Sequence, residues 1–284
     1  SNINENLASG TTIGNFSSTD VDAGDTHTYT LVTGTGDTDN ASFTIVSGAL
    51  RSAAIFNFEV KSSYSIRVRT TDAGGLTYEE AFTITINNVN EAPTDITLSS
   101  STINEGLAVG TAVGTLGSVD VDASDTHTYT LVSGTGDTDN ASFTISGNTL
   151  QSAAIFNFNT QSSYSIRVRT TDAGSLTFEK VFTITINNVN QTPTDVSLSA
   201  SSINENLASG TTVGNFSSTD PDTGDTHTYT LVSGAGDTDN ASFTVSGGSL
   251  LSAAVFNFEV KNSYSIRVRT TDAGGLFYEE IFTI

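Results

Sequence analysis

Paired acidic residues recur along the chain at a fixed spacing. The triplet Asp20–Asp22 appears again as Asp120–Asp122 and as Asp220–Asp222, and further Asp, Glu and Asn residues gather near the ends of strand-like segments in each copy. Calcium, a hard divalent cation, is bound by about six to eight oxygen atoms from carboxylates, amides and carbonyls. These residue types therefore predict a calcium site, whereas they do not suit a metal that requires His or Cys.

The simpler interpretation is that Asp, Asn and Gly form ordinary turns, and for a single Asp-x-Asp it would suffice. Turns, however, require neither glutamate nor a large excess of negative charge. The chain contains 31 Asp and Glu against 10 Lys and Arg, a net charge of -21. Such a surface attracts cations and repels phosphate backbones and anionic lipids. We therefore expect calcium as a partner, and neither nucleic acid nor insertion of this segment into a membrane.

The whole sequence repeats with a period of 100 residues. The segment Tyr64–Asp72 returns unchanged at 164–172 and at 264–272. A length of 284 residues would suggest about two domains, but the repeat predicts three. The first copy is expected to lack a lead-in strand and the third to stop before its end, as in a window of a longer array. The expected domains are residues 1–90, 91–190 and 191–284.

Apolar residues in each copy alternate with a period of two, which indicates strands rather than helices. Tyr64, Ile66 and Val68, for example, alternate with serine and arginine. Strands with one buried and one wet face predict two antiparallel sheets packed as a sandwich. The predicted fold is all-β: three tandem seven-stranded Greek-key sandwiches of immunoglobulin-like size in a linear array. In the second copy the predicted strands are about residues 95–99, 111–117, 126–132, 141–146, 149–151, 163–171 and 177–187.

The composition excludes several other kinds of site. The chain has no Cys, Met or Trp, so it forms neither a disulfide scaffold nor a cysteine-ligated metal site. One histidine in each copy cannot assemble a zinc site, and His27, His127 and His227 are expected to be half-buried strand residues. The stretch Asp37–Asn40 is expected to be a polar turn. A catalytic centre copied three times would be unusual, so no enzyme is expected.

Taken in order, the motifs resemble the cadherin repeat, in the form found in large bacterial surface and secreted proteins. Asp20–Asp22 matches the Asp-x-Asp loop of that family, and Glu5 matches its early glutamate. Phe56–Glu59 is similar to its Leu-Asp-Arg-Glu motif, Thr70–Asp72 to its Ala-x-Asp, and Asn88–Pro93 to its Asp-x-Asn-Asp-Asn-x-Pro linker. The resemblance covers the whole chain in three passes and implies cadherin-like sandwiches.

The resemblance also implies that calcium lies between repeats, held by the end of one repeat, the linker and the start of the next. For the junction of repeats 1 and 2, the implied ligands are Glu5, Asn57, Glu59, Asn88, Asn90, Glu91, Asp120, Asp122 and Asp172. For the junction of repeats 2 and 3, they are Glu105, Asn157, Asn159, Asn188, Asn190, Gln191, Asp220, Asp222 and Asp272. Two half sites remain, formed by Asp20, Asp22 and Asp72 and by Glu205, Asn257 and Glu259.

The two junctions differ in charge. Glu59 and Glu91 of the first are replaced by Asn159 and Gln191 in the second, so the first set has six carboxylates and the second has four. Since ligand charge raises calcium affinity, the second junction is expected to bind more weakly or to hold fewer ions. Asparagine also stands where the family has its first linker aspartate, which argues against a full set of three ions at either junction.

The predicted function is that of a calcium-binding structural module of an extracellular adhesin or stalk, at the cell surface or secreted. Calcium would stiffen the junctions, and the array would support cell adhesion. The alternative is a calcium-dependent carbohydrate-binding module of a secreted protein. The partners expected besides calcium are other copies of the same protein or surface glycans.

Overall fold

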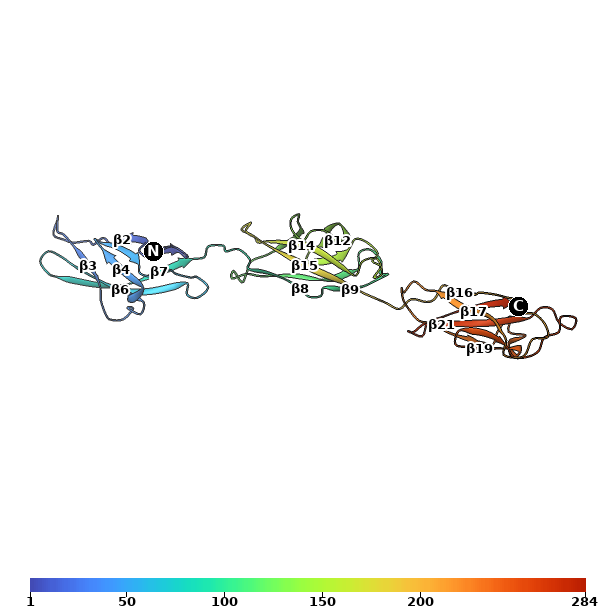
Figure 1. Cartoon of the computed structure of the whole chain (residues 1–284). Helices are drawn as coiled ribbons and strands as arrows, with labels where there is room; N and C mark the ends of the chain where they lie inside the picture. Colours follow the sequence, from blue (N-terminus) through green and yellow to red (C-terminus); the bar gives the residue numbers. More distant parts are fainter.

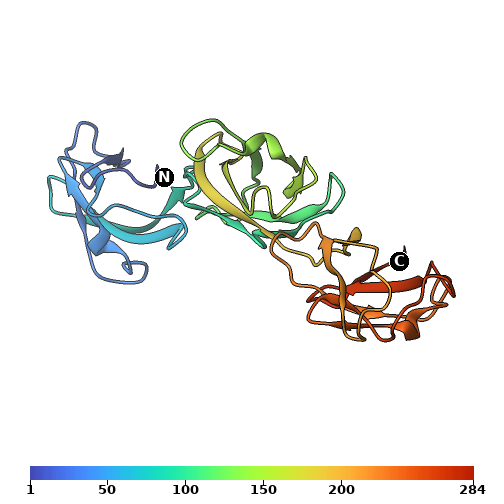
Figure 2. The same ribbon diagram turned by 45° about the vertical axis from the view of Figure 1, so that its right-hand side comes forward.

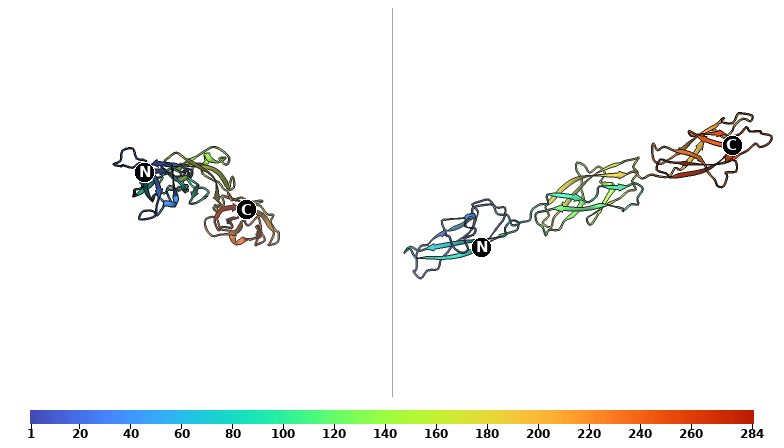
Figure 3. Two further views of the ribbon diagram at one scale, coloured as in Figure 1. Left: turned by 90° about the vertical axis from the view of Figure 1, so that its left-hand side faces the viewer. Right: turned by 90° about the horizontal axis from the view of Figure 1, so that it is seen from below.

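The strands of the computed structural model, which describes residues 1–284, fall into three groups that follow the repeat. Each group forms a separate body, and the three bodies lie in a row joined by extended linkers (Figure 1). The row is not straight, since the third repeat lies off the line through the first two (Figure 2). A view from below shows the same elongated arrangement (Figure 3).

The strand bounds are nearly the same in the three repeats. Repeat 1 has β1 (Asn2–Asn4), β2 (Thr12–Asn15), β3 (Thr28–Leu31), β4 (Phe43–Val46), β5 (Ala49–Ser52), β6 (Ser63–Thr71) and β7 (Thr77–Asn87). Repeat 2 has β8 (Asp95–Leu98), β9 (Thr102–Asn104), β10 (Ala112–Val119), β11 (Thr128–Leu131), β12 (Phe143–Ser146), β13 (Thr149–Ser152), β14 (Ser163–Thr171) and β15 (Thr177–Asn187). Repeat 3 has β16 (Asp195–Leu198), β17 (Thr212–Thr219), β18 (Thr228–Leu231), β19 (Phe243–Ser246), β20 (Ser249–Ser252), β21 (Ser265–Thr271) and β22 (Phe277–Thr283).

Each repeat contains two sheets, as the alternation predicts. In repeat 2 one sheet has the order β12-β13-β10-β8 and the other β11-β14-β15-β9. The predicted strands 163–171 and 177–187 are β14 and β15, which pair along their whole length from Ser163 opposite Thr185 to Thr171 opposite Thr177. This long hairpin carries an acidic residue, Asp172, in its turn and leads into the linker at its other end.

The expectation that all strands are antiparallel is wrong at one position in repeats 1 and 2. β1 pairs in parallel with the end of β7, and β9 pairs in parallel with the end of β15. β9 is also an eighth strand that the predicted seven do not include. A three-residue strand shows too little alternation to be recognised in a sequence, and here only its pairing with a long neighbour defines it.

Repeat 1 differs from the others along one edge. In repeat 2, β8 pairs with the second half of β10, from Leu116 opposite Leu98 to Val119 opposite Asp95. Repeat 1 has no counterpart of β8, and β2 ends at Asn15. A strand continues only where its backbone groups find a partner, so β2 is half the length of β10.

Each repeat has its own hydrophobic core. Ile66, Ile166 and Ile266 are equivalent residues with no exposed surface, and each lies in a different cluster of buried side chains. Since no cluster extends across a linker, the packing that stabilises each sandwich is independent of the junctions. The helical segments are single 3-10 turns of three residues, and none could cross a bilayer.

Candidate metal centres at the junctions between repeats

Glu5 is fixed at the end of repeat 1 that meets the linker, which we call the base. It follows β1, and the parallel pairing with β7 brings it beside the start of the linker. Its side chain is only 1% exposed. One carboxylate oxygen, Oε2, accepts a hydrogen bond from the Phe58 N–H at 2.7 Å, and Oε1 accepts one from the Val89 N–H at 2.9 Å. Glu5 therefore holds the linker against the base.

Three carboxylates face one another at this base. Oxygen atoms of Glu5, Glu59 and Glu91 lie within 4.8 Å of one another. The Glu91 Oε1 atom accepts a hydrogen bond from Asn6, but its Oε2 atom is buried without a partner. Burial raises the pKa of Glu91, and the neighbouring carboxylates of Glu5, Asp122 and Glu59 raise it further. The cluster therefore has more negative charge than the protein itself neutralises.

The linker also contacts repeat 2, at the end that we call the apex. The Asn88 side-chain amide donates to Asp122 Oδ1 at 2.8 Å, and the Glu91 N–H donates to Asp122 Oδ2 at 2.9 Å. These hydrogen bonds lower the pKa of Asp122. Asp122 is 8% exposed, whereas its counterpart Asp22, which has no linker above it, is exposed.

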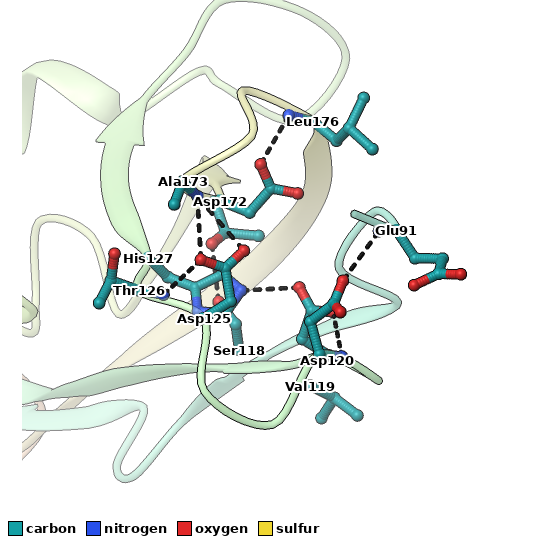
Figure 4. Close-up of polar contacts among 12 residues, drawn as sticks. Glu91, Ser118, Val119, Asp120, Asp125, Thr126, His127, Asp172, Ala173 and Leu176 are labelled. Carbon is teal, nitrogen blue, oxygen red and sulfur yellow. Dashed lines mark hydrogen bonds and ion pairs between the residues drawn. The ribbon is translucent and has the colours of Figure 1, made fainter. Parts of the chain in front are cut away.

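The apex holds a second group of acids. Asp120, Asp125 and His127 offer ligand atoms within 4.8 Å of one another. Asp172, from the β14–β15 turn, accepts a hydrogen bond from the Asn90 side-chain amide at 3.0 Å. Figure 4 shows these acids converging from separate loops, with the side chain of Glu91 directed away from them. The linker therefore lies between two acidic groups, one on each repeat.

Asp125 is a candidate ligand that the sequence analysis missed, together with its equivalents Asp25 and Asp225. Asp25 and Asp225 lie in corresponding groups with Asp20 and Asp72 and with Asp220 and Asp272. The sequence does contain a pattern that could have indicated these ligands, because an Asp follows the first Asp of each pair by five residues in all three copies. This Asp is preceded by Gly or Ser, however, and such a pair is typical of a turn.

The prediction that the histidines are strand residues is wrong in detail. His127 lies one residue before β11, and its Nε2 atom lies 2.9 Å from Asp120 Oδ2. His27 and His227 make the same contact with Asp20 and Asp220, at 3.1 Å and 2.9 Å. Each imidazole is half-buried as expected, but it orients an apex carboxylate rather than only filling the core.

Two of the implied ligands accept hydrogen bonds within local turns. Asn57 Oδ1 accepts a hydrogen bond from the Val60 N–H at 2.8 Å, and Asn157 Oδ1 accepts one from the Thr160 N–H at 3.0 Å.

The polar stretch Asp37–Asn40 forms a turn, as expected. Asp37 accepts a hydrogen bond from the Gly34 N–H at 3.0 Å.

The junction of repeats 2 and 3 has the same framework. Glu105 accepts hydrogen bonds from the Phe158 and Val189 N–H groups, both at 2.9 Å. The Gln191 N–H donates to Asp222 Oδ2 at 2.6 Å. The other oxygen of Asp222, Oδ1, is buried without a partner. Asn190 donates to Asp272 at 3.0 Å, and Asp220 is held by its histidine as described above.

The second junction differs where Asn159 replaces a glutamate. The Asn159 side-chain amide donates directly to the Pro221 carbonyl of repeat 3 at 2.9 Å. The Asn88 side-chain amide donates to Asp122 Oδ1, but Asn188 makes no such hydrogen bond to Asp222. The Oδ1 atom of Asp222 therefore has no partner. The second junction thus has fewer charges and one direct bond between repeats.

The half sites keep part of the arrangement of the complete junctions. Asp20 and Asp72 lie together at the apex of repeat 1, and Asp22 is exposed beside them. At the base of repeat 3, Glu205 accepts a hydrogen bond from the Phe258 N–H at 2.9 Å, and Asn257 caps its turn at Val260. Glu259 is exposed beside them.

These donor sets fit a hard divalent cation. The donors are carboxylate and amide oxygens, which suit calcium better than a soft metal. Buried carboxylate oxygens without partners, at Glu91 and at Asp222, occur at both junctions. A buried anionic oxygen of this kind is costly unless a cation or a hydrogen-bond donor faces it.

Tandem sandwiches of this kind, with acids gathered between them, define a cadherin-like array, and solved structures share the fold. No family model matches the chain. Mouse cadherin-23 EC22-24 superposes with a TM-score of 0.63 at 19% identity, covering 99% of this chain and 93% of that one. Extracellular cadherin domains 1–4 of protocadherin gamma B7 superpose with a TM-score of 0.67 at 20% identity, covering 100% of this chain and 73% of that one.

A protein with a similar sequence is also a cadherin. The mouse cadherin EGF LAG seven-pass G-type receptor 2 is 30% identical over 267 residues, which cover 90% of this chain. The chain spans only 9% of the length of that receptor. The chain thus consists of cadherin-like repeats, and the relatives are far longer proteins.

Proposed function

We propose that the chain is a calcium-dependent structural segment of an extracellular adhesion protein, with one domain in each of residues 1–90, 91–190 and 191–284. The observation that carries the proposal is the Glu91 carboxylate. It lies among the acids of the base, has a buried oxygen without a partner, and its backbone N–H contacts Asp122 of the next repeat. A cation held at this carboxylate would join the base to the linker, and the backbone of the linker is bonded to the next repeat.

The residues available to hold calcium at the first junction come from three segments. The base offers Glu5 and Glu59, the linker offers Asn88, Asn90 and Glu91, and the apex offers Asp120, Asp122, Asp125 and Asp172. Calcium would supply the positive charge that these carboxylates lack. Glu5 fixes the start of the linker and Asp122 fixes its end through backbone N–H groups, so the protein itself orients the linker.

Stiffening follows from the charge balance. Without a cation, like charges at the base and the apex repel one another, and the linker has no strand pairing of its own. With a cation, the same charges favour the docked arrangement. Because each sandwich has a separate core, the ion would control the angle between repeats rather than their folding.

Adhesion and an extracellular location are supported by the similar proteins, which are cadherins and extracellular cadherin domains. The relatives are cadherins, which supports a structural role rather than an enzymatic one. Contacts with partners would be made by the whole protein. The simplest candidate for a partner is another copy of the same protein.

Small-angle scattering of the whole chain, in millimolar calcium and in chelator, tests the proposal. We expect a narrow distribution of overall dimensions in calcium and a broader one in chelator. Asp122→Asn should abolish much of the difference, whereas the control Glu80→Gln, which removes one charge from β7 away from both junctions, should retain it. Identical profiles in both solutions, with no calorimetric heat at several millimolar calcium, would refute the proposal.

A further inference from the structure

The two linkers place an asparagine side chain on the same turn of the following repeat. At the first junction this turn joins β14 to β15. It is closed by hydrogen bonds from the Leu176 N–H to Asp172 Oδ1, at 2.7 Å, and from the Asp172 N–H to the Leu176 carbonyl, at 3.1 Å. The second oxygen of Asp172, Oδ2, accepts the hydrogen bond from Asn90. The position of Asn90 is thus tied to the shape of the turn.

The Asn90 side chain packs directly against the backbone of a glycine in this turn, Gly174. A Cβ atom built on Gly174 would lie closer than 3.0 Å to the amide carbon and both terminal atoms of Asn90, an approach that real Cβ atoms do not show. Gly274 stands in the same relation to Asn190. At Gly74, in the repeat without a preceding linker, the nearest atom is Asp72 Oδ1 at 3.4 Å, an ordinary contact.

The backbone itself does not require glycine at these positions. The left-handed conformation of the turn falls on the next residue, which is Ser175 with φ of 73° in repeat 2 and Gly275 with φ of 92° in repeat 3. Gly174 and Gly274 lie outside the positive-φ region. Alanine could therefore adopt the backbone conformation at either position, and the close approach of the Asn90 or Asn190 side chain is what disfavours it.

We infer that Gly174 and Gly274 are positioning residues, each forming a seat for the side-chain amide of the preceding linker. The seat holds Asn90 or Asn190 against the apex carboxylate and thereby places an amide oxygen donor beside the candidate metal centre. This inference rests on the proposed function for its effect on calcium, but the seat itself is a steric contact that needs no ion.

The test uses the whole chain and hydrogen exchange read by mass spectrometry, which reports linkers 88–92 and 188–192 separately. In Gly174→Ala we expect the free calcium needed to protect linker 88–92 to rise about tenfold, since overpacking of a close contact typically costs enough free energy for such a change. Linker 188–192 serves as an internal reference. Gly274→Ala should show the reverse pattern, and Gly74→Ala should leave both linkers unchanged.

A double-mutant cycle separates the seat from a general effect on the turn. Asn90→Ala removes the side chain that would clash, so adding Gly174→Ala to Asn90→Ala should change the first junction less than twofold. If Gly174→Ala perturbs both backgrounds equally, the glycine matters for the turn and not for the linker, and the inference fails. It also fails if Gly174→Ala alone has no effect on linker 88–92. Protection of β14 and β15 verifies that the variants fold.

Failure of the inference is distinguishable from failure of the proposed function. The exchange of linker 88–92 is also measured in chelator, where Gly174→Ala should accelerate it and Gly74→Ala should not. If calcium protects neither linker in the unmodified chain, the proposed function is wrong, yet the comparison in chelator still decides whether the seat exists.

Discussion

Exchanging the acids between the junctions should exchange their calcium affinities. In the variant Glu59→Asn/Glu91→Gln, the first junction acquires the residues of the second. Asn159→Glu/Gln191→Glu makes the reverse change. We expect calcium to bind the first junction more weakly in the former variant and the second more tightly in the latter.

The size of the effect follows from the distances at the base. Oxygens of Glu5, Glu59 and Glu91 lie within 4.8 Å of one another. A pair of unit charges at this separation interacts by about 3 kcal/mol at an effective dielectric constant of ~20 and by about 1 kcal/mol in water. A cation held among these oxygens would lie closer than this to each of them, so we take the lower value as a minimum for both the exposed Glu59 and the partly buried Glu91. Two lost charges then weaken calcium binding by about tenfold to a hundredfold.

The same substitutions should act with the opposite sign in chelator. Without calcium, the three carboxylates of the base repel one another, so Glu59→Asn/Glu91→Gln should make the first linker more ordered. Asn159→Glu/Gln191→Glu should loosen the second linker, because it adds charge and removes the direct bond from Asn159 to the Pro221 carbonyl.

Hydrogen exchange of each linker across a calcium titration measures both effects in one chain. The unmodified protein should show a lower calcium midpoint at linker 88–92 than at linker 188–192. Equal midpoints, or a lower one at the second linker, would show that carboxylate number does not set the affinity. A variant that changes in the same direction in calcium and in chelator would refute the electrostatic argument.

Three further predictions concern the ion, the cores and the third repeat. Calorimetry should detect calcium binding with dissociation constants of roughly 10⁻⁴–10⁻³ M, the range of extracellular modules, and no heat at several millimolar calcium would contradict it. Asp122→Ala should free the first linker while circular dichroism retains the full strand signal; a global loss would show that the sandwiches depend on the junction. Burial and the Asp195 carboxylate raise the pKa of Glu280 above the ordinary 4.5, so the folded repeat binds this proton more tightly than the unfolded chain does. Its stability should therefore fall as the pH rises from about 4.5 through the raised pKa. Glu280→Lys, which copies the 2.8 Å bond between Lys180 and Asp95 of repeat 2, should raise the thermal midpoint and remove that fall, and an unchanged midpoint would contradict it.

Much of the fold could be predicted because local pattern and tertiary structure agree in the long strands. The alternation over 163–171 and 177–187 gave strands with the same bounds as β14 and β15. The strand Thr102–Asn104 could not be predicted, since three residues carry no periodicity and its parallel partner lies far along the chain. For the same reason the sequence did not indicate that the short strands β1 and β9 pair in parallel with β7 and β15.

The candidate site was predictable in composition but not in arrangement. The repeat spacing identified the acids of the base and the apex, because calcium ligands are recognisable by residue type. It did not identify Asp125, since an Asp in a Gly-rich or Ser-rich loop is equally typical of a turn. The resemblance implied Asn57 as a ligand, and in the structure its side-chain oxygen also accepts a hydrogen bond from the Val60 N–H in a local turn.

The number of repeats, the sandwich class and the excess of acidic residues near the strand ends all follow from the amino-acid sequence alone. These properties depend on periodicity and composition, which are local. The contacts of individual oxygen atoms depend on tertiary packing. Glu5 holds the linker at the base of repeat 1, the linker buries Asp122 at the apex of repeat 2, and Gly174 lets the Asn90 side chain approach. Such contacts join residues that are tens of positions apart, and two of the three join the linker to the next repeat, so they depend on how folded segments meet, which no local pattern in the chain encodes.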